Sequence, residues 1–223
     1  MNMAVNMNVE RARFNMIEQQ IRPWDVLDPV VLDLLSTVRR EDFVPEASKA
    51  LAFADVELPL AQGAAMLEPK LEARLLQEAG VKPTDKVLEV GAGSGYMAAL
   101  LAASAEYVVS VEIEQALVAM ARDNLSRAGV ANVVVEQGDG LRGWAAKAPF
   151  DVIVISGSVT AIPDELLQQL KVGGRLVGIV GSLPVMSAQL VTRTGEKTFN
   201  TVNLFETVAR PLRNAAQSEQ FVF

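Results

Sequence analysis

The sequence of 223 residues contains no cysteine and no histidine. Without cysteine, the chain can form no disulfide, no thiolate metal site and no cysteine nucleophile. Without histidine, it has no imidazole to act as a general base near neutral pH, and histidine-based zinc chemistry is excluded. We therefore expect no metal, and any chemistry must rely on carboxylates, hydroxyls, amides, lysine, arginine or a cofactor.

Aromatic residues, positive charge and long apolar runs are also scarce. Only 5% of the residues are aromatic although 50% are hydrophobic, so alanine, valine and leucine supply most of the core. The net charge of −7 argues against a nonspecific nucleic-acid binder, which needs a basic face. No apolar run approaches the ~20 residues of a membrane span, and the first residues lack the pattern of a signal peptide. We expect a cytoplasmic protein that binds neither nucleic acid nor membrane.

The pattern of the chain changes near residue 80. Residues 1–80 predict an N-terminal helical extension: an amphipathic helix over 8–21, a second helix capped by Asp28 before Pro29, and a short helix ending at Gly80. The segment between the last two contains three prolines and is expected to wrap around the core. Arg22, Arg39 and Arg40 fit a solvated face better than an anion site.

Residues 81–223 alternate short apolar runs with helical patterns, which implies parallel strands buried on both faces. The end differs, because two strand patterns flank Thr194-Gly195-Glu196 without a helix between them and must pair antiparallel. We predict a doubly wound, mostly parallel α/β sheet of Rossmann-like type with an antiparallel C-terminal strand pair, packed with the extension into one compact unit. The last residues are expected to be a loose tail on which Phe221 and Phe223 could dock.

The stretch "VLEVGAGSGYMAALLA" joins a strand to a helix through Gly91, Gly93 and Gly95. Bare backbone at a helix N-terminus can approach a polar or anionic ligand, although a tight turn without a ligand has the same pattern. Dinucleotide sites prefer G-x-G-x-x-G, whereas the third glycine position here is Tyr96. Glu89, just before the first glycine, repels a phosphate and attracts an ammonium group. The turn therefore favours S-adenosylmethionine, which carries an amino group and a sulfonium.

Two further acids end the next two strands. Glu112 can accept hydrogen bonds from both hydroxyls of a ribose, while Glu114 is expected to be an exposed neighbour or a helix cap. Asp139 could accept from the amino group of an adenine, or simply form an Asp-Gly turn. Open α/β sheets bind ligands at the carboxyl ends of their strands. The joint occurrence of Glu89, Glu112 and Asp139 there predicts the cofactor site.

Several segments, in this order, resemble the protein-L-isoaspartate O-methyltransferase family, a group of class I S-adenosylmethionine-dependent methyltransferases. They include "MIEQQI", "REDFVPE", the glycine stretch, "SVEIEQAL", "QGDGLRGWAAKAPFDVIVISG", "IPDELLQQLKVGGRLVGIVG" and "FETVARPL". The resemblance implies an enzyme that methylates the carboxylate of L-isoaspartyl residues in damaged proteins, which are then its partners. It also implies a set of cofactor-binding residues: Glu89, Gly91, Ala92, Gly93, Gly95, Glu112, Ile113, Asp139 and Gly140.

The substrate loop departs from the family pattern. In "LPLAQGAAMLEP", Ala65 stands where the family has threonine and Leu67 where it has serine. Glu68 adds a negative charge to a site meant for an anion. Ser156 retains a hydroxyl where the family has threonine. These three positions, 65, 67 and 156, are the expected catalytic positions.

Three functions therefore stay open. A nearby hydroxyl, from Ser156 or Ser158, substitutes for the missing ones and the family activity is retained. Alternatively, the acceptor is a different, smaller or more apolar molecule, and Met66 lines an apolar pocket for it. In the third case, the chain binds S-adenosylmethionine without transferring its methyl group. The sequence carries no signal for an oligomeric state.

Overall fold

The computed structural model describes residues 3–215, with side chains from residue 8 onward, so Phe221 and Phe223 lie outside the described residues. The helices are α1 (Met3–Met16), α2 (Pro29–Thr37), α3 (Pro69–Ala79), α4 (Tyr96–Ala102), α5 (Gln115–Arg127) and α6 (Asp164–Gln168). The strands are β1 (Leu58–Pro59), β2 (Ala65–Met66), β3 (Lys86–Val90), β4 (Tyr107–Glu112), β5 (Val133–Gln137), β6 (Phe150–Val159), β7 (Leu170–Ser182), β8 (Val185–Arg193) and β9 (Phe199–Thr207). Within residues 3–215, no helix is long and apolar enough to cross a bilayer.

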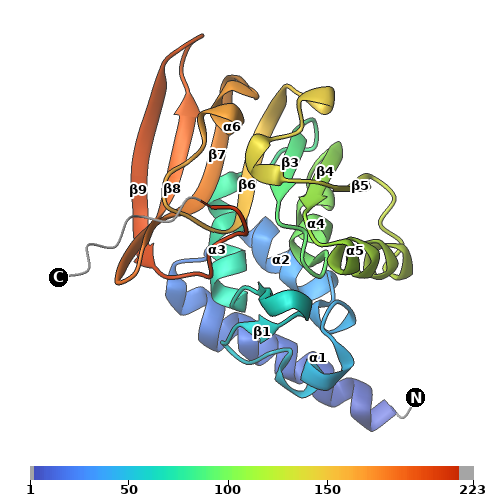
Figure 1. Cartoon of the computed structure of the whole chain (residues 1–223). Coiled ribbons are helices and arrows are strands. Elements are labelled where there is room, and N and C mark those ends of the chain that lie inside the picture. Colours follow the sequence, from blue (N-terminus) through green and yellow to red (C-terminus); the bar gives the residue numbers. More distant parts are fainter. Residues whose placement is uncertain (1–2, 216–223) are drawn as a thin grey trace, which may run out of the picture.

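Seven strands form one sheet in the order β5-β4-β3-β6-β7-β8-β9, with β9 at one edge and β5 at the other (Figure 1). Strands β3 to β7 are parallel to one another, whereas β8 pairs antiparallel with both β7 and β9. Only Leu183 and Pro184 connect β7 to β8, which is too short for a crossover, so the chain turns back on itself. The prediction of a mostly parallel sheet with an antiparallel C-terminal pair is confirmed.

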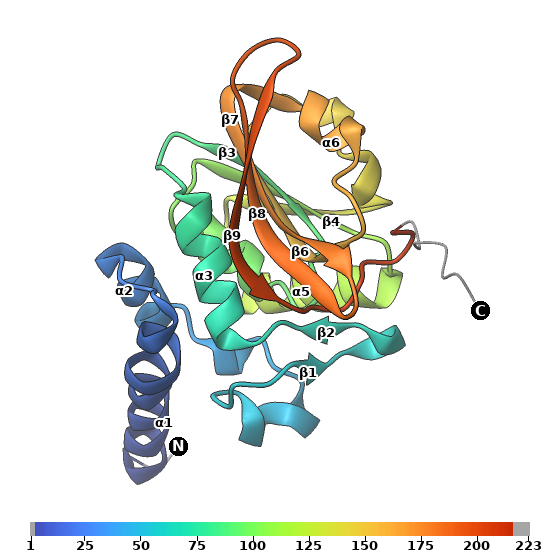
Figure 2. The ribbon, with the colours of Figure 1, turned by 90° about the vertical axis from the view of Figure 1, so that its left-hand side faces the viewer.

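Helices α3, α4 and α5 pack on one face of the sheet, and the shorter α6 packs on the other (Figure 2). Side chains alternate between these faces along β3, where Val87 joins the core beneath α3 to α5 and Leu88 joins the core beneath α6. Both layers are apolar because parallel strands with helices on both sides have no solvated face. The doubly wound architecture is therefore confirmed, with an asymmetric pair of covering layers.

The N-terminal segment wraps around one end of this sheet as predicted. Asp28 caps α2 through a hydrogen bond from the Val30 N–H to its carboxylate at 2.8 Å. The prediction that Arg40 lies on a solvated face was wrong. Its guanidinium is buried, pairs with Glu72 on α3, and donates to the carbonyl of Leu67 at 2.8 Å. A division at residue 80 stays a prediction, and α3 itself packs on β6 and β7.

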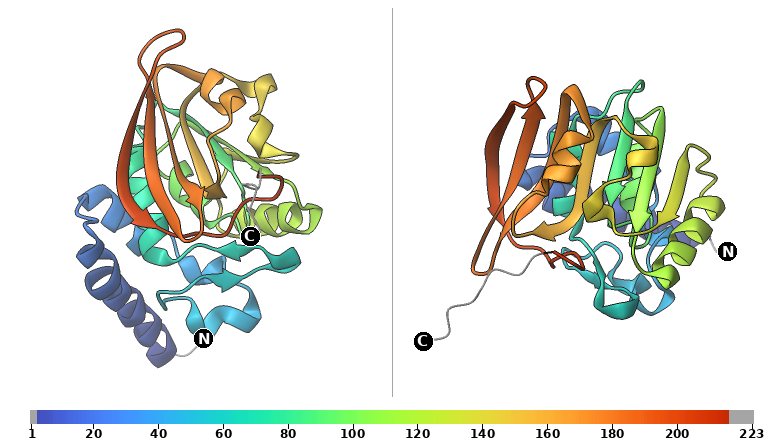
Figure 3. Two further views of the ribbon diagram at one scale, coloured as in Figure 1. Left: turned by 60° about the vertical axis from the view of Figure 1, so that its left-hand side comes forward. Right: turned by 45° about the horizontal axis from the view of Figure 1, so that its top comes forward.

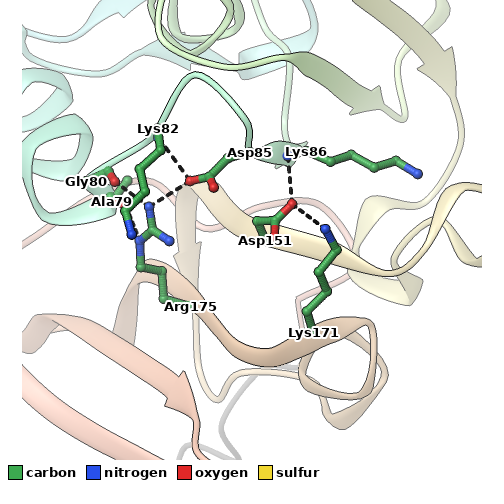
Figure 4. Close-up of polar contacts among 8 residues, drawn as sticks. All are labelled: Ala79, Gly80, Lys82, Asp85, Lys86, Asp151, Lys171 and Arg175. Carbon is green, nitrogen blue, oxygen red and sulfur yellow. Dashed lines mark hydrogen bonds and ion pairs between the residues drawn. The ribbon is translucent and has the colours of Figure 1, made fainter.

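A polar network ties together the amino ends of β3, β6 and β7 (Figure 4). Arg175 pairs with Asp85 at 2.9 Å and also donates to two backbone carbonyls at the end of α3. Asp151 accepts from the Lys86 N–H at 2.9 Å and from the Lys171 ammonium at 2.7 Å. Partial burial acts to raise the pKa of Asp151, but these two donors outweigh it and hold the pKa below its ordinary value. This end of the sheet is closed by structural contacts, which leaves the carboxyl ends for a site.

Candidate active site

A cavity of about 820 Å³, its mouth included, opens at the carboxyl ends of β3, β4 and β6. The β1–β2 hairpin and the segment 210–213 that follows β9 lie at the same end of the sheet (Figure 3), and residues of both segments line the cavity. The predicted site residues that line it are Ala65, Leu67, Gly91, Gly93, Glu112, Ile113, Asp139, Gly140 and Ser156.

The glycine turn after β3 combines close approach to the cavity with close packing of helices. Gly91, Gly93 and Gly95 have φ angles of 94°, 52° and 85°, a region that other residues enter only with strain. Gly91 and Gly93 line the cavity. At Gly95, a β-carbon would lie 3.2 Å from the backbone oxygen of Ala121, so this glycine lets α4 pack on α5. The structure thus gives Gly95 a packing role, outside the cavity wall.

Glu89 lies at the base of the turn and is fully buried. It accepts hydrogen bonds from the hydroxyls of Ser110 and Ser156, the latter at 3.1 Å. Burial raises the pKa of Glu89 to about 8, although both hydroxyls act to lower it. Glu89 lines a smaller cavity, which shares part of its wall with the larger one. Ala92 and the buried Met66 also line this smaller cavity. The Glu89 carboxyl beside the glycine turn therefore keeps its proton at neutral pH.

Glu112 faces the larger cavity and also braces the glycine turn. Its carboxylate accepts from the Gly93 N–H at 2.9 Å and from the Glu114 N–H at 3.0 Å. Each carboxylate oxygen retains a second lone pair for a ligand hydroxyl. Glu114 was predicted to be an exposed neighbour or a helix cap, and it is the N-cap residue of α5, although its side chain makes no capping hydrogen bond. It also lines the cavity and pairs with Arg213. Acceptance of ribose hydroxyls by Glu112 stays a prediction.

Asp139 forms the Asp-Gly turn that the sequence allowed, whereas its acceptance from an adenine amino group stays a prediction. Its carboxylate accepts from the Leu141 N–H at 3.1 Å, which forms the tight turn, and from the amide of Asn214 at 3.3 Å. It also lines the cavity, so a ligand can still reach it. At the neighbouring Gly140, a β-carbon would lie 2.7 Å from Val90, which explains why glycine is needed to bring the turn close to the sheet.

The acceptor-side positions also reach the site. Ala65, Leu67 and Ser156 line both cavities. Ser158 does not, because its hydroxyl is buried and donates to the carbonyl of Ala209 at 2.8 Å. The prediction that Glu68 burdens the acceptor site was wrong. It precedes α3 and its carboxylate lies 3.2 Å from the ammonium of Lys70, outside both cavities.

Residues 11–214 match the family model described as Protein-L-isoaspartate(D-aspartate) O-methyltransferase. This chain belongs to that family. Relatives named protein-L-isoaspartate O-methyltransferase include one from Koribacter versatilis, 43% identical over 83% of this chain and 82% of its own. Another, from Rhodopseudomonas palustris, is 39% identical over 92% of this chain and 94% of its own. The resemblance inferred from the motifs is therefore confirmed.

Two solved structures show that the fold is that of this methyltransferase family. One, named protein-L-isoaspartate O-methyltransferase, has a TM-score of 0.78 at 24% identity and covers 92% of this chain and 65% of its own. A second, from Plasmodium falciparum, has a TM-score of 0.75 at 18% identity and covers 92% of this chain and 97% of its own. That protein was solved in complex with S-adenosyl-L-homocysteine.

Sequence reasoning missed the part of this methyltransferase that follows β9. Leu212 lies against the glycine turn, where β-carbons on Gly91 and Gly157 would come within 3.0 Å and 2.7 Å of its side chain. Arg210 pairs with Glu57 at 2.7 Å, and Arg213 pairs with Glu114. The segment "FETVARPL" entered the sequence analysis only as a family motif. The partners of Arg210 and Arg213 lie 153 and 99 residues away along the chain, and no local sequence pattern indicates such pairs.

Proposed function

We propose that this protein is an S-adenosylmethionine-dependent O-methyltransferase that methylates the carboxylate of L-isoaspartyl residues in damaged proteins. The observation that carries the proposal is a family match over residues 11–214, together with one cavity that most of the expected cofactor and acceptor positions line. The product ester is expected to collapse through a succinimide, which makes this a repair reaction. Proteins and peptides that carry isoaspartyl residues are its proposed partners.

The residues at the site fit this cofactor. Gly91 and Gly140 bring bare backbone close to a ligand, and Glu112 and Asp139 offer carboxylate oxygens to its ribose and adenine. For its amino group, the smaller cavity presents the buried carboxyl of Glu89. The hydroxyl of Tyr96, which is buried and has no hydrogen-bond partner among the described residues, lines the same cavity. When bound, S-adenosylmethionine supplies a methyl group activated by the adjacent sulfonium.

Methyl transfer to a carboxylate needs few catalytic groups from the protein. The nucleophile is a carboxylate of the substrate, which is already ionised at neutral pH, so no general base is needed. This agrees with a chain that contains no histidine. The protein must align the nucleophile and exclude water. Apolar Ala65 and Leu67 exclude water from the cavity wall, and the bond from Arg40 to the Leu67 carbonyl fixes the loop.

The apolar character of positions 65 and 67 favours one alternative, a methyltransferase with a more apolar acceptor. Transfer of labelled methyl to a peptide containing L-isoaspartate, compared with its normal aspartyl twin, separates the two. The proposal expects transfer to the isoaspartyl peptide alone. Folded protein that binds S-adenosylhomocysteine but labels neither peptide would contradict it.

A double variant tests whether positions 65 and 67 determine the methyl acceptor. Ala65→Thr with Leu67→Ser restores the hydroxyls that the family has at these positions. If the wild type is inactive on the isoaspartyl peptide and the double variant is active, the scaffold still presents that substrate, and the residues at positions 65 and 67 are what prevents its methylation. If both are active, the apolar loop is tolerated and the repair function stands.

A further inference from the structure

The acceptor side of the cavity offers few hydrogen-bond donors to an anionic substrate. Ala65 and Leu67 have no polar side-chain atoms, and the hydroxyl of Ser156 already donates to Glu89. The charges on the wall are mostly negative. Among the described residues that line the larger cavity, the acids are Glu57, Glu112, Glu114 and Asp139, and the cations are Arg210 and Arg213. A substrate carboxylate must therefore be attracted by one of these two arginines.

The two arginines have different partners. Arg213 donates to the carbonyl of Gln62 in the hairpin and pairs with Glu114, which follows β4 beside the proposed ribose carboxylate. Arg210 lies between the hairpin and the end of β6. Its guanidinium donates to Glu57 at 2.7 Å and to the carbonyl of Gly63 at 3.3 Å, and its own carbonyl accepts from the Ser158 N–H at 2.9 Å. Ala65 and Ser156, the proposed acceptor positions, belong to these same two segments.

We propose that Arg210 recognises the carboxylate of the methyl acceptor and takes over the role of the hydroxyls missing at positions 65 and 67. This inference rests on the proposed function, because it concerns the acceptor of that reaction. A guanidinium presents two parallel N–H groups that match a carboxylate, which makes arginine the usual residue for such recognition. Arg210 is a specificity-determining residue in this reaction, since it contacts the substrate without taking part in methyl transfer.

A substrate carboxylate can replace Glu57 as the partner of Arg210, because the ion pair between Arg210 and Glu57 is partly exposed. Its side chain is 57% exposed, whereas that of Glu57 is 25% exposed, and ion pairs of such exposure contribute little free energy. Glu57 therefore holds the guanidinium at the cavity wall and competes with the substrate for it. In this arrangement, loss of the arginine and loss of its acidic partner have opposite effects on substrate binding. A purely structural clamp predicts the same effect from both, because either change breaks the pair.

The experiment measures steady-state methyl transfer to an L-isoaspartyl peptide for wild type, Arg210→Ala, Arg210→Lys and Glu57→Gln. Arg210→Ala should raise KM for the peptide about 10- to 100-fold, the usual effect of losing a charged hydrogen bond, with a smaller change in kcat. Arg210→Lys should raise KM less than Arg210→Ala does, because lysine keeps the positive charge but lacks the parallel N–H groups of the guanidinium. Glu57→Gln should lower KM for the peptide about two- to fivefold, because it frees the guanidinium.

Matched measurements separate this inference from loss of fold or of cofactor binding. Arg22→Ala removes one arginine from an exposed ion pair with Glu18, away from the cavity, and should leave KM for the peptide unchanged. Affinity for S-adenosylhomocysteine and the urea midpoint should change little in the Arg210 and Glu57 variants. An unchanged KM in Arg210→Ala, or a KM that rises in both Arg210→Ala and Glu57→Gln, would overturn the inference while leaving the proposed function intact. A wild type that labels no isoaspartyl peptide refutes the proposed function itself, and the inference with it.

Discussion

Ionisation of Glu89 should couple cofactor binding to pH. Burial raises its pKa from 4.5 to about 8, so the ligand-free protein holds a proton on this carboxyl through the neutral range. At pH 7, about one molecule in ten has Glu89 ionised. Ionising the remainder costs about 1 kcal/mol, the order of free energy that one pKa unit represents. Attraction between the carboxylate and an ammonium group in a buried site is large enough to supply it.

Binding of S-adenosylhomocysteine should therefore release a proton from Glu89. Below pH 8, the affinity of the wild type should rise by up to about tenfold per pH unit, and above pH 8 it should level off. Glu89→Gln keeps the shape and the hydrogen bonds from Ser110 and Ser156 but cannot ionise. At pH 8, the variant should bind more weakly than the wild type. Calorimetry at pH 7 in two buffers of different ionisation enthalpy should show close to one more proton released by the wild type.

The same shift affects the stability of the ligand-free protein. The pKa of Glu89 is higher in the folded than in the unfolded state, so the unfolded chain releases its proton first as pH rises. The free energy of unfolding should thus fall between pH 4.5 and pH 8, and Glu89→Gln should lack this contribution. Burial also raises the pKa of Glu72, to about 7, and this adds a similar slope to both proteins. The difference between them in urea unfolding is therefore the quantity to measure. Equal slopes together with equal affinities would refute the placement of Glu89 beside the amino group.

Three further predictions concern other parts of the structure. Glu112→Ala removes a proposed ribose acceptor and the brace of Gly93, and should weaken binding of S-adenosylhomocysteine by ~1–3 kcal/mol; an unchanged affinity in calorimetry contradicts the ribose placement. Arg40→Leu leaves Glu72 buried without its partner and should lower the free energy of unfolding, measured in urea, by ~3 kcal/mol. Adding Glu72→Leu should recover most of this loss. If the second substitution recovers nothing, the buried ion pair does not stabilise the protein in this way. Asp151→Asn should destabilise the protein by up to ~1 kcal/mol at pH 7. Because the pKa of Asp151 is lowered in the folded protein, the difference in stability between wild type and variant should diminish and vanish as the pH falls below about 4. A difference that stays constant with pH would argue against the ion pair.

Several features of the fold could be predicted because they depend on short stretches of chain. The alternation of apolar runs with helical patterns predicts buried parallel strands, and the absence of a helix around residues 194–196 predicts the antiparallel pair. The Asp28 cap was predictable because its hydrogen bond spans only two residues. At the site, the glycines after β3 and the acids after β4 and β5 were predictable because parallel strands end at one edge.

Other features depend on groups that only the folded chain brings together. The side chain of Arg40 was expected in solvent because arginine is seldom buried, but Glu72, 32 residues away, compensates its charge. Glu68 was expected at the acceptor because it belongs to the segment that resembles the substrate loop of the family, but it precedes α3 and its carboxylate lies beside the ammonium of Lys70.

By itself, the sequence determined the architecture, the family and the position of the cofactor turn, because periodicity and turn chemistry act over a few residues. Only the tertiary structure decided which groups surround the acceptor. The sheet brings the segment after β9 back across the glycine turn, so that Leu212 packs on Gly91 and Arg210 faces Glu57. Such pairings follow from where the strands and the hairpin place the backbone, and charges 153 residues apart carry no local sign of them.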